Sequence, residues 1–282
     1  MFFYLRLSYF CIFLLNREVI MDHTFVIPAY KDSPHLEACI NALRGQKRPT
    51  NILIATSTPS IYIQSIARKY DIPYYISESQ GGIGNDWNFA IESASTRYVT
   101  IAHQDDIYES NYTHEILKAI DQNGHKNPLI AFCNYVDVVN GIERKSSVNA
   151  IVKNLLLFPF WFKKTISSKL IKKAILSIGD PICCPSVTID RVNTDDIRFS
   201  KDHSCVLDWV AWLQLAKKNG AFIFVDKKLV KHRIHVDSET TNQIQNGKRR
   251  QEELEVLTGI WGKNIAQLVS KFYSKGYTDN NV

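Results

Sequence analysis

Short apolar runs alternate with segments of helical periodicity along the first hundred residues that follow Met21. The runs are rich in β-branched and aromatic residues and end at proline, glycine or polar residues, which predicts strands. We expect these strands at residues 24–27, 51–55, 74–76 and 98–102. Apolar residues at helical spacing predict intervening helices over residues 33–45, 61–70 and 85–94, the first of them capped by Ser33. This order predicts an α/β fold with a mostly parallel, twisted sheet flanked by helices.

The second half continues with strands and ends in helices. We expect strands at residues 129–135, 188–189 and 221–225, and an amphipathic helix at residues 207–216. Residues 244–273 predict one or two helices, on which the pairs Arg249–Arg250 and Glu252–Glu253 should form a solvated, self-paired face. Residues 277–282 read as a frayed tail. We therefore divide the chain at residues 1–20, 21–128, 129–243 and 244–282.

The first 20 residues precede this pattern and need a separate interpretation. Residues 2–15 are mostly apolar, but a bilayer span needs about 20 residues. No basic region precedes them and no small-residue cleavage site follows, so they make a poor signal peptide. Two interpretations stay open: an upstream extension of a protein that starts at Met21, or an N-terminal segment that touches a membrane.

Composition narrows the choice of partners. The chain has 282 residues, of which 45% are hydrophobic and 22% charged, as in an ordinary globular protein. A net charge of +6 is too small to argue for nucleic acid, although it suits an anionic ligand or an anionic membrane surface. The six cysteines lack Cys-x-x-Cys spacing, which favours free thiols in the cytosol.

Residues 154–178 are apolar, aromatic and basic. A stripe of apolar residues with lysines beside it predicts a helix, and the stripe consists of Ile166, Leu170, Ile171, Ala174 and Ile178. Such a helix can lie in a membrane interface. It can equally pack on the core and turn its lysines to water.

The first candidate chemistry follows the strand that ends at Ala102. Asp105 and Asp106 are adjacent carboxylates, which are costly to bury unless a cation neutralises them. If the backbone turns there, both can serve one Mg²⁺ or Mn²⁺ ion, which in turn holds phosphate. The alternative is a solvated turn in which Asp106 caps the next helix.

The carboxyl ends of parallel strands meet at one edge of a sheet, where such sheets bind ligands. The turns at residues 28–30, 56–60 and 105–106 should therefore converge on one crevice, which favours the metal–phosphate interpretation. The glycines at positions 81, 82 and 84 predict either a flexible loop into a helix or a backbone surface beside a nucleotide.

Two further clusters lie in the second half. Asp208 opens an amphipathic helix, where an acid is often only a cap or a partner of the helix dipole. His232, Arg233 and His235 form a compact basic cluster, which suits phosphate or, alternatively, a surface turn with a basic face. Residues 180–187 predict a rigid, partly buried turn without zinc spacing.

These residues together resemble the family 2 glycosyltransferases of bacterial polysaccharide type, which have the nucleotide-sugar-binding GT-A fold. The resemblance covers about residues 24–273. It is carried by Val26-Ile-Pro-Ala-Tyr30, Gly84-Asn-Asp-Trp-Asn88 and Ala102-His-Gln-Asp-Asp-Ile107. The last stretch usually reads Asp-x-Asp-Asp in the family, so His103 stands at the position of the first Asp.

The resemblance implies roles for individual residues. Asp105 and Asp106 would bind Mg²⁺ or Mn²⁺, and Asp208 would be the catalytic base, because the family's acidic dipeptide before a Trp reads Leu207-Asp208 here. Residues 180–187 would line the acceptor pocket, and Arg233 and His235 would lie on a flexible segment near the donor diphosphate. Contacts to the nucleotide sugar would come from Pro28, Ala29, Tyr30, Thr56, Asn85, Asn88, His103, Arg233 and His235. Thr56-Ser57 replaces an acid that contacts the base in many members, so the base stays open.

The function expected from the resemblance is metal-dependent, inverting sugar transfer. The donor would be a nucleotide-diphosphate sugar and the acceptor a glycan or lipid-linked glycan in cell-surface polysaccharide synthesis. We expect a cytoplasmic protein at the inner face of the cell membrane, with a peripheral membrane contact and no nucleic-acid partner. A nucleotidyltransferase would usually need a Gly-rich, Arg-bearing loop, which residues 28–33 do not provide. A basic membrane- or nucleic-acid-binding module would leave Asp105, Asp106 and Asp208 without a role.

Overall fold

The computed structural model describes residues 21–79, 81–144, 148–195, 197–235 and 247–273. The predictions for residues 1–20, 236–241 and 277–282 lie outside these ranges. The strands are β1 (His23–Pro28), β2 (Asn51–Thr56), β3 (Tyr74–Ile76), β4 (Tyr98–Ile101), β5 (Ile107–Tyr108), β6 (Pro128–Val139), β7 (Ile142–Glu143), β8 (Thr165–Ile166), β9 (Val187–Asp190) and β10 (Ala221–Ile234). The helices are α2 (Leu36–Arg44), α3 (Ile61–Tyr70), α4 (Ile83–Glu92), α5 (Tyr112–Gln122), α6 (Val148–Leu156), α7 (Pro159–Phe162), α8 (Lys169–Ile175), α9 (Leu207–Lys217), α11 (Lys248–Trp261) and α12 (Lys263–Tyr273).

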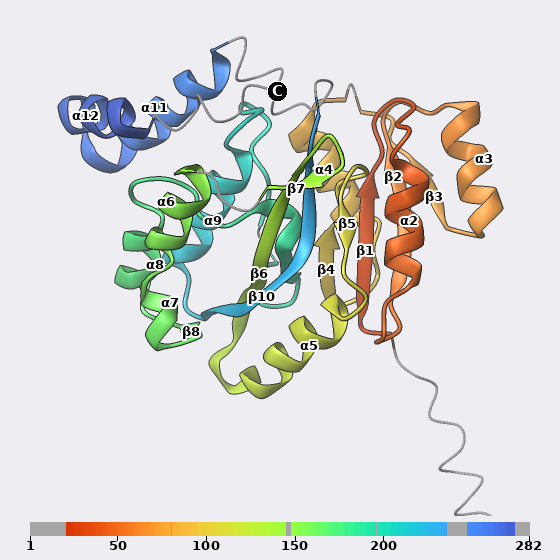
Figure 1. Cartoon of the computed structure of the whole chain (residues 1–282), viewed down its shortest axis with the longest axis horizontal. Helices are drawn as coiled ribbons and strands as arrows, with labels where there is room; N and C mark the ends of the chain where they lie inside the picture. Colours follow the sequence, from red (N-terminus) through yellow and green to blue (C-terminus); the bar gives the residue numbers. More distant parts are fainter. Residues whose placement is uncertain (1–20, 80, 145–147, 196, 236–246, 274–282) are drawn as a thin grey trace, which may run out of the picture.

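One sheet organises the described residues, in the order β3-β2-β1-β4-β9-β6-β10-β5, with β7 beside β6 and β8 beside β10 (Figure 1). β1 runs parallel to β2 and β4, and β2 runs parallel to β3. β9 is antiparallel to both of its neighbours, β4 and β6, whereas β6 and β10 pair in parallel over most of their length. The predicted α/β fold with a sheet flanked by helices is confirmed, and its second half is mixed.

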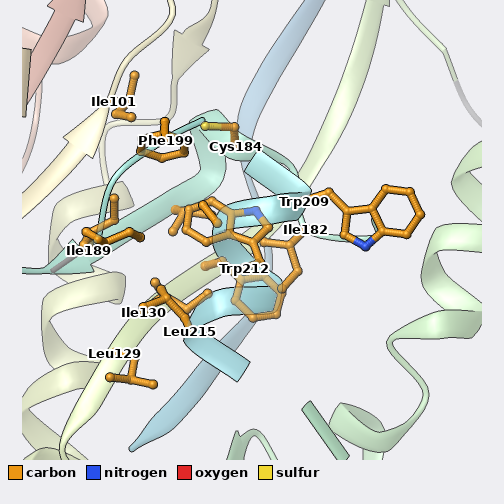
Figure 2. Packing of buried hydrophobic residues seen from close by; sticks show 14 of the residues in the cluster. Ile101, Leu129, Ile130, Ile182, Cys184, Ile189, Phe199, Trp209, Trp212 and Leu215 are labelled. Carbon is orange, nitrogen blue, oxygen red and sulfur yellow. The ribbon is translucent and has the colours of Figure 1, made fainter. Parts of the chain in front are cut away.

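Alternate residues of the central strands enter two separate cores, as the two-residue period of a strand requires. Phe25 and Ile27 of β1 pack with apolar side chains of α2, α3 and α5. Val26 packs on the opposite face with α4 and α9. Figure 2 shows part of this second core, where Trp212 and Leu215 of α9 belong to the same cluster as Ile130 of β6. Both faces of the sheet are therefore covered by helices.

β6 and β10 are longer than their apolar runs predict. The predicted strand at 221–225 ends where exposed residues 226–227 bulge out of the ladder, and pairing with β6 then resumes at Lys228 and continues as far as Ile234. Arg233 therefore lies on a strand rather than on the flexible segment expected for it. The bulge breaks the period-two pattern, which explains why this extension was not predicted.

Other differences concern helices. The basic apolar region forms α6, α7, β8 and α8 instead of one stripe, and Ile166 lies in a strand. α5 was not predicted. α2 begins at Leu36, because residues 33–35 form a turn in which the Leu36 N–H donates to the Ser33 carbonyl (3.3 Å), so Ser33 does not cap the helix.

The one or two helices predicted for residues 244–273 are present as two, α11 and α12, but the prediction of a solvated acidic face is wrong. Glu252 and Glu253 are only 4% and 6% exposed. Arg249 does pair with Glu253 at 3.0 Å, whereas Glu252 binds backbone N–H groups of Ser204 and Cys205. Over the described ranges, no helix combines the length and apolar character that crossing a bilayer requires. The described cysteines are free thiols, as predicted: Cys39, Cys133, Cys183, Cys184 and Cys205.

Candidate active site

A cavity of about 840 Å³ opens at the carboxyl ends of β1, β4, β6 and β10. Strand ends contribute Pro28, Asp137 and Arg233 to its lining, and the turn after β4 contributes His103 and Asp105. The starts of α4, α9 and α11, together with α6, close the other sides. The predicted convergence on one crevice is therefore confirmed for two of the three turns, through Pro28, Tyr30 and Asp105. It is wrong for the turn at residues 56–60, none of which lines the cavity.

Asp106 is fully buried beneath this edge, at 0% exposure. Its Oδ1 accepts a hydrogen bond from the Arg233 backbone N–H (2.9 Å), whereas its Oδ2 is buried and has no hydrogen-bond partner among the described residues. The alternative of a solvated turn is wrong for this residue. Asp106 does not cap a helix either, because α5 begins only at Tyr112.

Asp105 ties the same turn to the end of β10. His235 Nε2 donates to Asp105 Oδ2 at 3.0 Å, and Arg233 Nε donates to the Asp105 backbone carbonyl at 2.9 Å. Burial opposes ionisation of Asp105, but the His235 hydrogen bond and nearby histidines outweigh it and hold its pKa below the usual value. Burial raises the pKa of neighbouring Asp106, so a bare second negative charge is unfavourable there.

Two histidines beside these carboxylates have pKa values shifted in opposite directions. Burial lowers the pKa of His103 to about 4, so its ring is neutral and able to ligate a metal. The ring lies 5.2 Å from that of Trp87 on α4, and its Nε2 is buried with no hydrogen-bond partner in the part of the chain that the structure describes. Burial also acts to lower the pKa of His232, but the carboxylates of Asp106 and Asp137 outweigh it and raise the value to about 9.

The residues present fit a divalent cation. One ligand atom each from His103, Asp105 and Asp106 lie within 4.8 Å of one another. A buried carboxylate oxygen without a partner, as at Asp106 Oδ2, costs free energy unless a cation or another donor pairs with it. The two carboxylates are suitable ligands for Mn²⁺ or Mg²⁺.

A second group of acids lies elsewhere in the cavity, where Asp208 opens α9. Asp208 Oδ1 accepts from the Trp209 N–H (2.9 Å), and Asp180 Oδ1 accepts from the Ile182 N–H (2.9 Å). Burial raises the pKa of Asp208, while the Trp209 N–H and Arg249 oppose the shift. Burial and then the charge of Asp208 raise the pKa of Asp180 well above its usual range, so two negative charges on this pair are unfavourable.

The start of α9 is held in place by contacts on both sides of it. Glu252 of α11 accepts hydrogen bonds from the backbone N–H groups of Ser204 (3.0 Å) and Cys205 (2.8 Å). The indole N–H of Trp209 donates to the Leu176 carbonyl (2.8 Å). These contacts fix the backbone around Asp208, which gives its carboxylate a defined position in the cavity.

Five of the predicted donor contacts line the cavity: Pro28, Tyr30, His103, Arg233 and His235. Gln104 connects two of the contributing segments, since its amide donates to the Tyr30 carbonyl (3.0 Å) and accepts from the Tyr30 N–H (3.1 Å). Gly82 at the start of α4 also lines the cavity, with a φ of 101° that glycine adopts readily.

The other four predicted donor contacts do not line the cavity: Ala29, Thr56, Asn85 and Asn88. The Asn88 amide is occupied within the fold, because it donates to the Phe199 carbonyl (2.9 Å) and accepts from the Phe199 N–H (2.8 Å). Thr56 is buried and its hydroxyl accepts from the Thr58 N–H (3.0 Å). Asn85 donates to the Gly81 carbonyl (2.8 Å), which shapes the loop before α4.

Sequence reasoning missed several charged residues of the lining, among them Asp137, Lys153, Arg249 and Glu253. Asp137 follows Tyr135 at the two-residue spacing of a strand, and both line the cavity, so a longer β6 would have indicated it. Lys153 donates to the Tyr135 hydroxyl (3.1 Å). No sequence signal brings α6 and α11 to this site. The predicted acceptor segment does line it, through Asp180 and residues 182–185.

The model of Glycosyl transferase family 2 matches residues 24–189. No curated protein matches the sequence. TarS 1–349 of S. aureus in complex with UDP-GlcNAc is similar in structure, with a TM-score of 0.61 and 14% identity over 92% of this chain and 73% of that chain. The mannosyltransferase PcManGT of Pyrobaculum calidifontis, in complex with GDP-Man and Mn²⁺, has a TM-score of 0.59 and 10% identity over 99% and 83% of the two chains.

Proposed function

The chain belongs to glycosyl transferase family 2, and from this premise we propose that it transfers one sugar from a nucleoside-diphosphate donor to an acceptor hydroxyl, in a metal-dependent reaction that inverts the anomeric centre. One observation carries the proposal. The same cavity is lined by the carboxylate of Asp105 with Arg233 beside it and, on another element, by the carboxylate of Asp208. Diphosphate binding and proton removal can therefore be served by separate groups.

His103, Asp105 and Asp106 would hold Mg²⁺ or Mn²⁺. When bound, such a cation stabilises the negative charge that develops on a diphosphate leaving group. Arg233 adds a fixed positive charge, and Asp105 and Asp106 position its backbone and its Nε. Among the described residues its two terminal nitrogens make no hydrogen bond, so they are available to phosphate oxygens.

Asp208 would act as the base. In an inverting displacement the acceptor hydroxyl attacks the anomeric carbon directly, and a carboxylate within hydrogen-bond reach takes its proton as the bond forms. Burial raises the pKa of Asp208 toward the range in which a general base is most effective. Burial and the charge of Asp208 raise the pKa of Asp180, which favours Asp208 as the base and Asp180 as a hydrogen-bond donor to an acceptor oxygen.

The donor class is supported by the structural relatives, whose complexes contain UDP-GlcNAc, UDP or GDP-Man. The acceptor in the proposal is a glycan or lipid-linked glycan of cell-surface polysaccharide synthesis, reached from the cytoplasmic face of the membrane. Rigid residues 182–185 beside Asp208 would form the acceptor side of the cavity.

The proposal is tested by incubating the purified chain with a panel of nucleotide sugars that includes UDP-GlcNAc and GDP-Man. Released nucleoside diphosphate is measured with Mn²⁺, with Mg²⁺ and with excess EDTA. We expect turnover of one donor that requires the cation and that collapses in Asp105→Asn, because a negative ligand is lost without a change in size. Asp71→Asn is the matched control, since Asp71 lies outside the cavity at the end of α3.

Two results would contradict the proposal. One is an absence of turnover with every donor in the panel. The other is turnover that persists in EDTA and in Asp105→Asn at the rate of the Asp71→Asn control, which would remove the metal from the mechanism.

A further inference from the structure

The surface formed by α6, α7 and α8 carries six large apolar side chains that are at least half exposed and that the proposed chemistry does not use. The exposed fractions are 61% for Ile151, 63% for Leu155, 50% for Phe158, 56% for Trp161, 83% for Phe162 and 79% for Leu170. We call these six residues the apolar patch. Single exposed apolar residues are ordinary, whereas a group of them on consecutive elements marks an interaction surface.

The aromatic members of the patch lie against one another at the surface. The Phe158 ring is 6.4 Å from the Trp161 ring and 5.8 Å from the Phe162 ring, in edge-to-face arrangements. The cluster therefore presents the apolar area of three rings to solvent at one place. A partner could bury this area. A partner with a broad apolar layer is therefore favoured.

The charge around the patch has one sign. Residues 144–179 contain eight Lys and Arg and no Asp or Glu, although the whole chain has a net charge of only +6. Lys163, Lys169 and Lys173 are exposed beside the patch. Within the described residues none of these three lysines forms an ion pair, so their charges are available to an anionic partner.

The patch is mounted rigidly on the sheet. Phe160 of α7 is fully buried, with its ring 5.3 Å from Phe132 of β6 and 5.6 Å from Phe224 of β10. On α8 the buried Lys172 ammonium donates to the carbonyls of Lys218 (2.9 Å) and Gly220 (2.8 Å). These anchors fix the patch relative to the cavity.

α6 lies between the patch and the cavity and contributes residues to both. Lys153 lines the cavity, while Ile151 and Leu155 are each two residues away, or about 200° around a helix. One side of α6 therefore faces the acceptor side of the cavity and the other side carries the patch. A helix with its side chains is about 10 Å thick, so a surface that covers the patch lies close to the cavity.

We propose that the apolar patch and its three lysines dock on a lipid bilayer that contains anionic headgroups, and that the acceptor reached there is lipid-linked. The second part rests on the proposed sugar transfer, whereas the first does not. A bilayer offers apolar and anionic groups together, as this surface requires. A second copy of the chain would place two clusters of lysines against each other in an isologous contact, which is unfavourable.

Vesicle flotation tests the docking surface with the full chain. The wild type should float with vesicles of phosphatidylglycerol and phosphatidylcholine, and more weakly with pure phosphatidylcholine or in high salt. Trp161→Ser and Phe162→Ser should each weaken binding about tenfold, because an apolar side chain is removed from the bilayer interface. Lys169→Ala and Lys173→Ala should each weaken it about fivefold.

The matched controls lie on α3, at the opposite end of the sheet in Figure 1. Ile61 is 88% exposed, and Arg68 is exposed on the same helix, so Ile61→Ser and Arg68→Ala remove the same kinds of group elsewhere. Donor hydrolysis without vesicles should stay at the wild-type level in all six variants, which shows that they are folded. A loss confined to the patch variants supports the proposal.

Other outcomes overturn it. Equal losses in the α3 controls, or no flotation of the wild type, remove the docking surface. A wild-type dimer in solution that Phe162→Ser converts to a monomer assigns the patch to a second copy. Transfer of labelled sugar from the donor to membrane vesicles, with no label in the lipid extract, removes the lipid-linked acceptor. If no donor is hydrolysed but only patch variants lose flotation, the docking surface stands and the proposed function fails.

Discussion

Replacement of Asp208 by Asn separates proton removal from donor binding. The amide keeps the shape of the carboxylate and can still accept the hydrogen bond that Asp208 Oδ1 receives from the Trp209 N–H (2.9 Å). It cannot take a proton from an acceptor hydroxyl at neutral pH. We therefore expect a folded protein that binds its donor normally and transfers sugar slowly.

The magnitude follows from the role of the residue. A positioned general base contributes about 10²–10⁴ to a rate, which corresponds to about 3–5.5 kcal/mol of activation free energy. The residues proposed to hold the diphosphate, including Asp105 and Arg233, lie at the ends of β4 and β10 instead of on α9. Donor affinity should therefore change by less than about threefold, within the range expected of an isosteric change away from the diphosphate.

The assay measures the two properties separately. Donor affinity comes from calorimetric titration with the nucleotide sugar and Mn²⁺, and transfer comes from single-turnover incubation of bound donor with acceptor. Arg233→Ala should show the complementary result, since loss of its guanidinium weakens donor binding as well as turnover.

Asp180→Asn is the informative companion to Asp208→Asn. Because burial and the charge of Asp208 keep Asp180 protonated, a neutral amide at this position should leave the transfer rate within about a factor of ten. If Asp180→Asn abolishes transfer while Asp208→Asn transfers bound donor normally, the base is Asp180 and Asp208 is a structural residue of α9.

Three further variants test the fold around the site. Glu252→Gln should lower the free energy of unfolding by about 1–3 kcal/mol at pH 7. Burial opposes ionisation of Glu252, but backbone N–H groups hold its pKa below the usual value, so the deficit in urea midpoint should shrink as the pH falls through that lowered pKa. Gly84→Ala would drive a Cβ into the Ser200 carbonyl and should cost about 1–3 kcal/mol in the same assay, whereas Gly124→Ala meets no atom and should be nearly neutral. Neighbouring carboxylates outweigh the burial of His232 and raise its pKa to about 9. The stabilisation that its charged form contributes is therefore complete below pH 6.5 and is lost as the pH rises to about 9. His232→Gln in EDTA should accordingly show a melting temperature that varies less with pH over that range.

The sequence predicted best those strands and helices whose apolar pattern lies entirely within the element itself. β1 to β4 each carry a compact apolar run, and their order with α2, α3 and α4 leaves few topologies for a sheet. α5 was missed although Tyr112, Ile116, Leu117 and Ile120 repeat at helical spacing, so that omission was avoidable. The antiparallel direction of β9 was not predictable, because its four residues say nothing about the neighbours between which they insert.

The residues of the candidate site also fall into those that the sequence could indicate and those that it could not. Asp105 and Asp106 could be identified because two carboxylates after a buried strand need an explanation, and burial of Asp106 supplies the physical reason. Lys153 and Glu253 could not be found, because only packing of α6 and α11 brings them to the cavity. Asn88 was predicted to contact the donor but does not line the cavity. Its amide lies in a motif shared with the family, but here it binds the backbone of Phe199, a residue 111 positions away.

β10 connects the two surfaces on which the proposals depend. Its first residues pair with β8 and contact Phe160, so they support the apolar patch. Its last residues place Arg233 against Asp105 and Asp106. Because β10 pairs with β6 from end to end apart from the bulge, these surfaces belong to one continuous piece of sheet. Docking of the patch on a bilayer would therefore fix the height of the proposed diphosphate site above the lipid, and an acceptor held in that lipid would meet the donor without a rearrangement of the sheet.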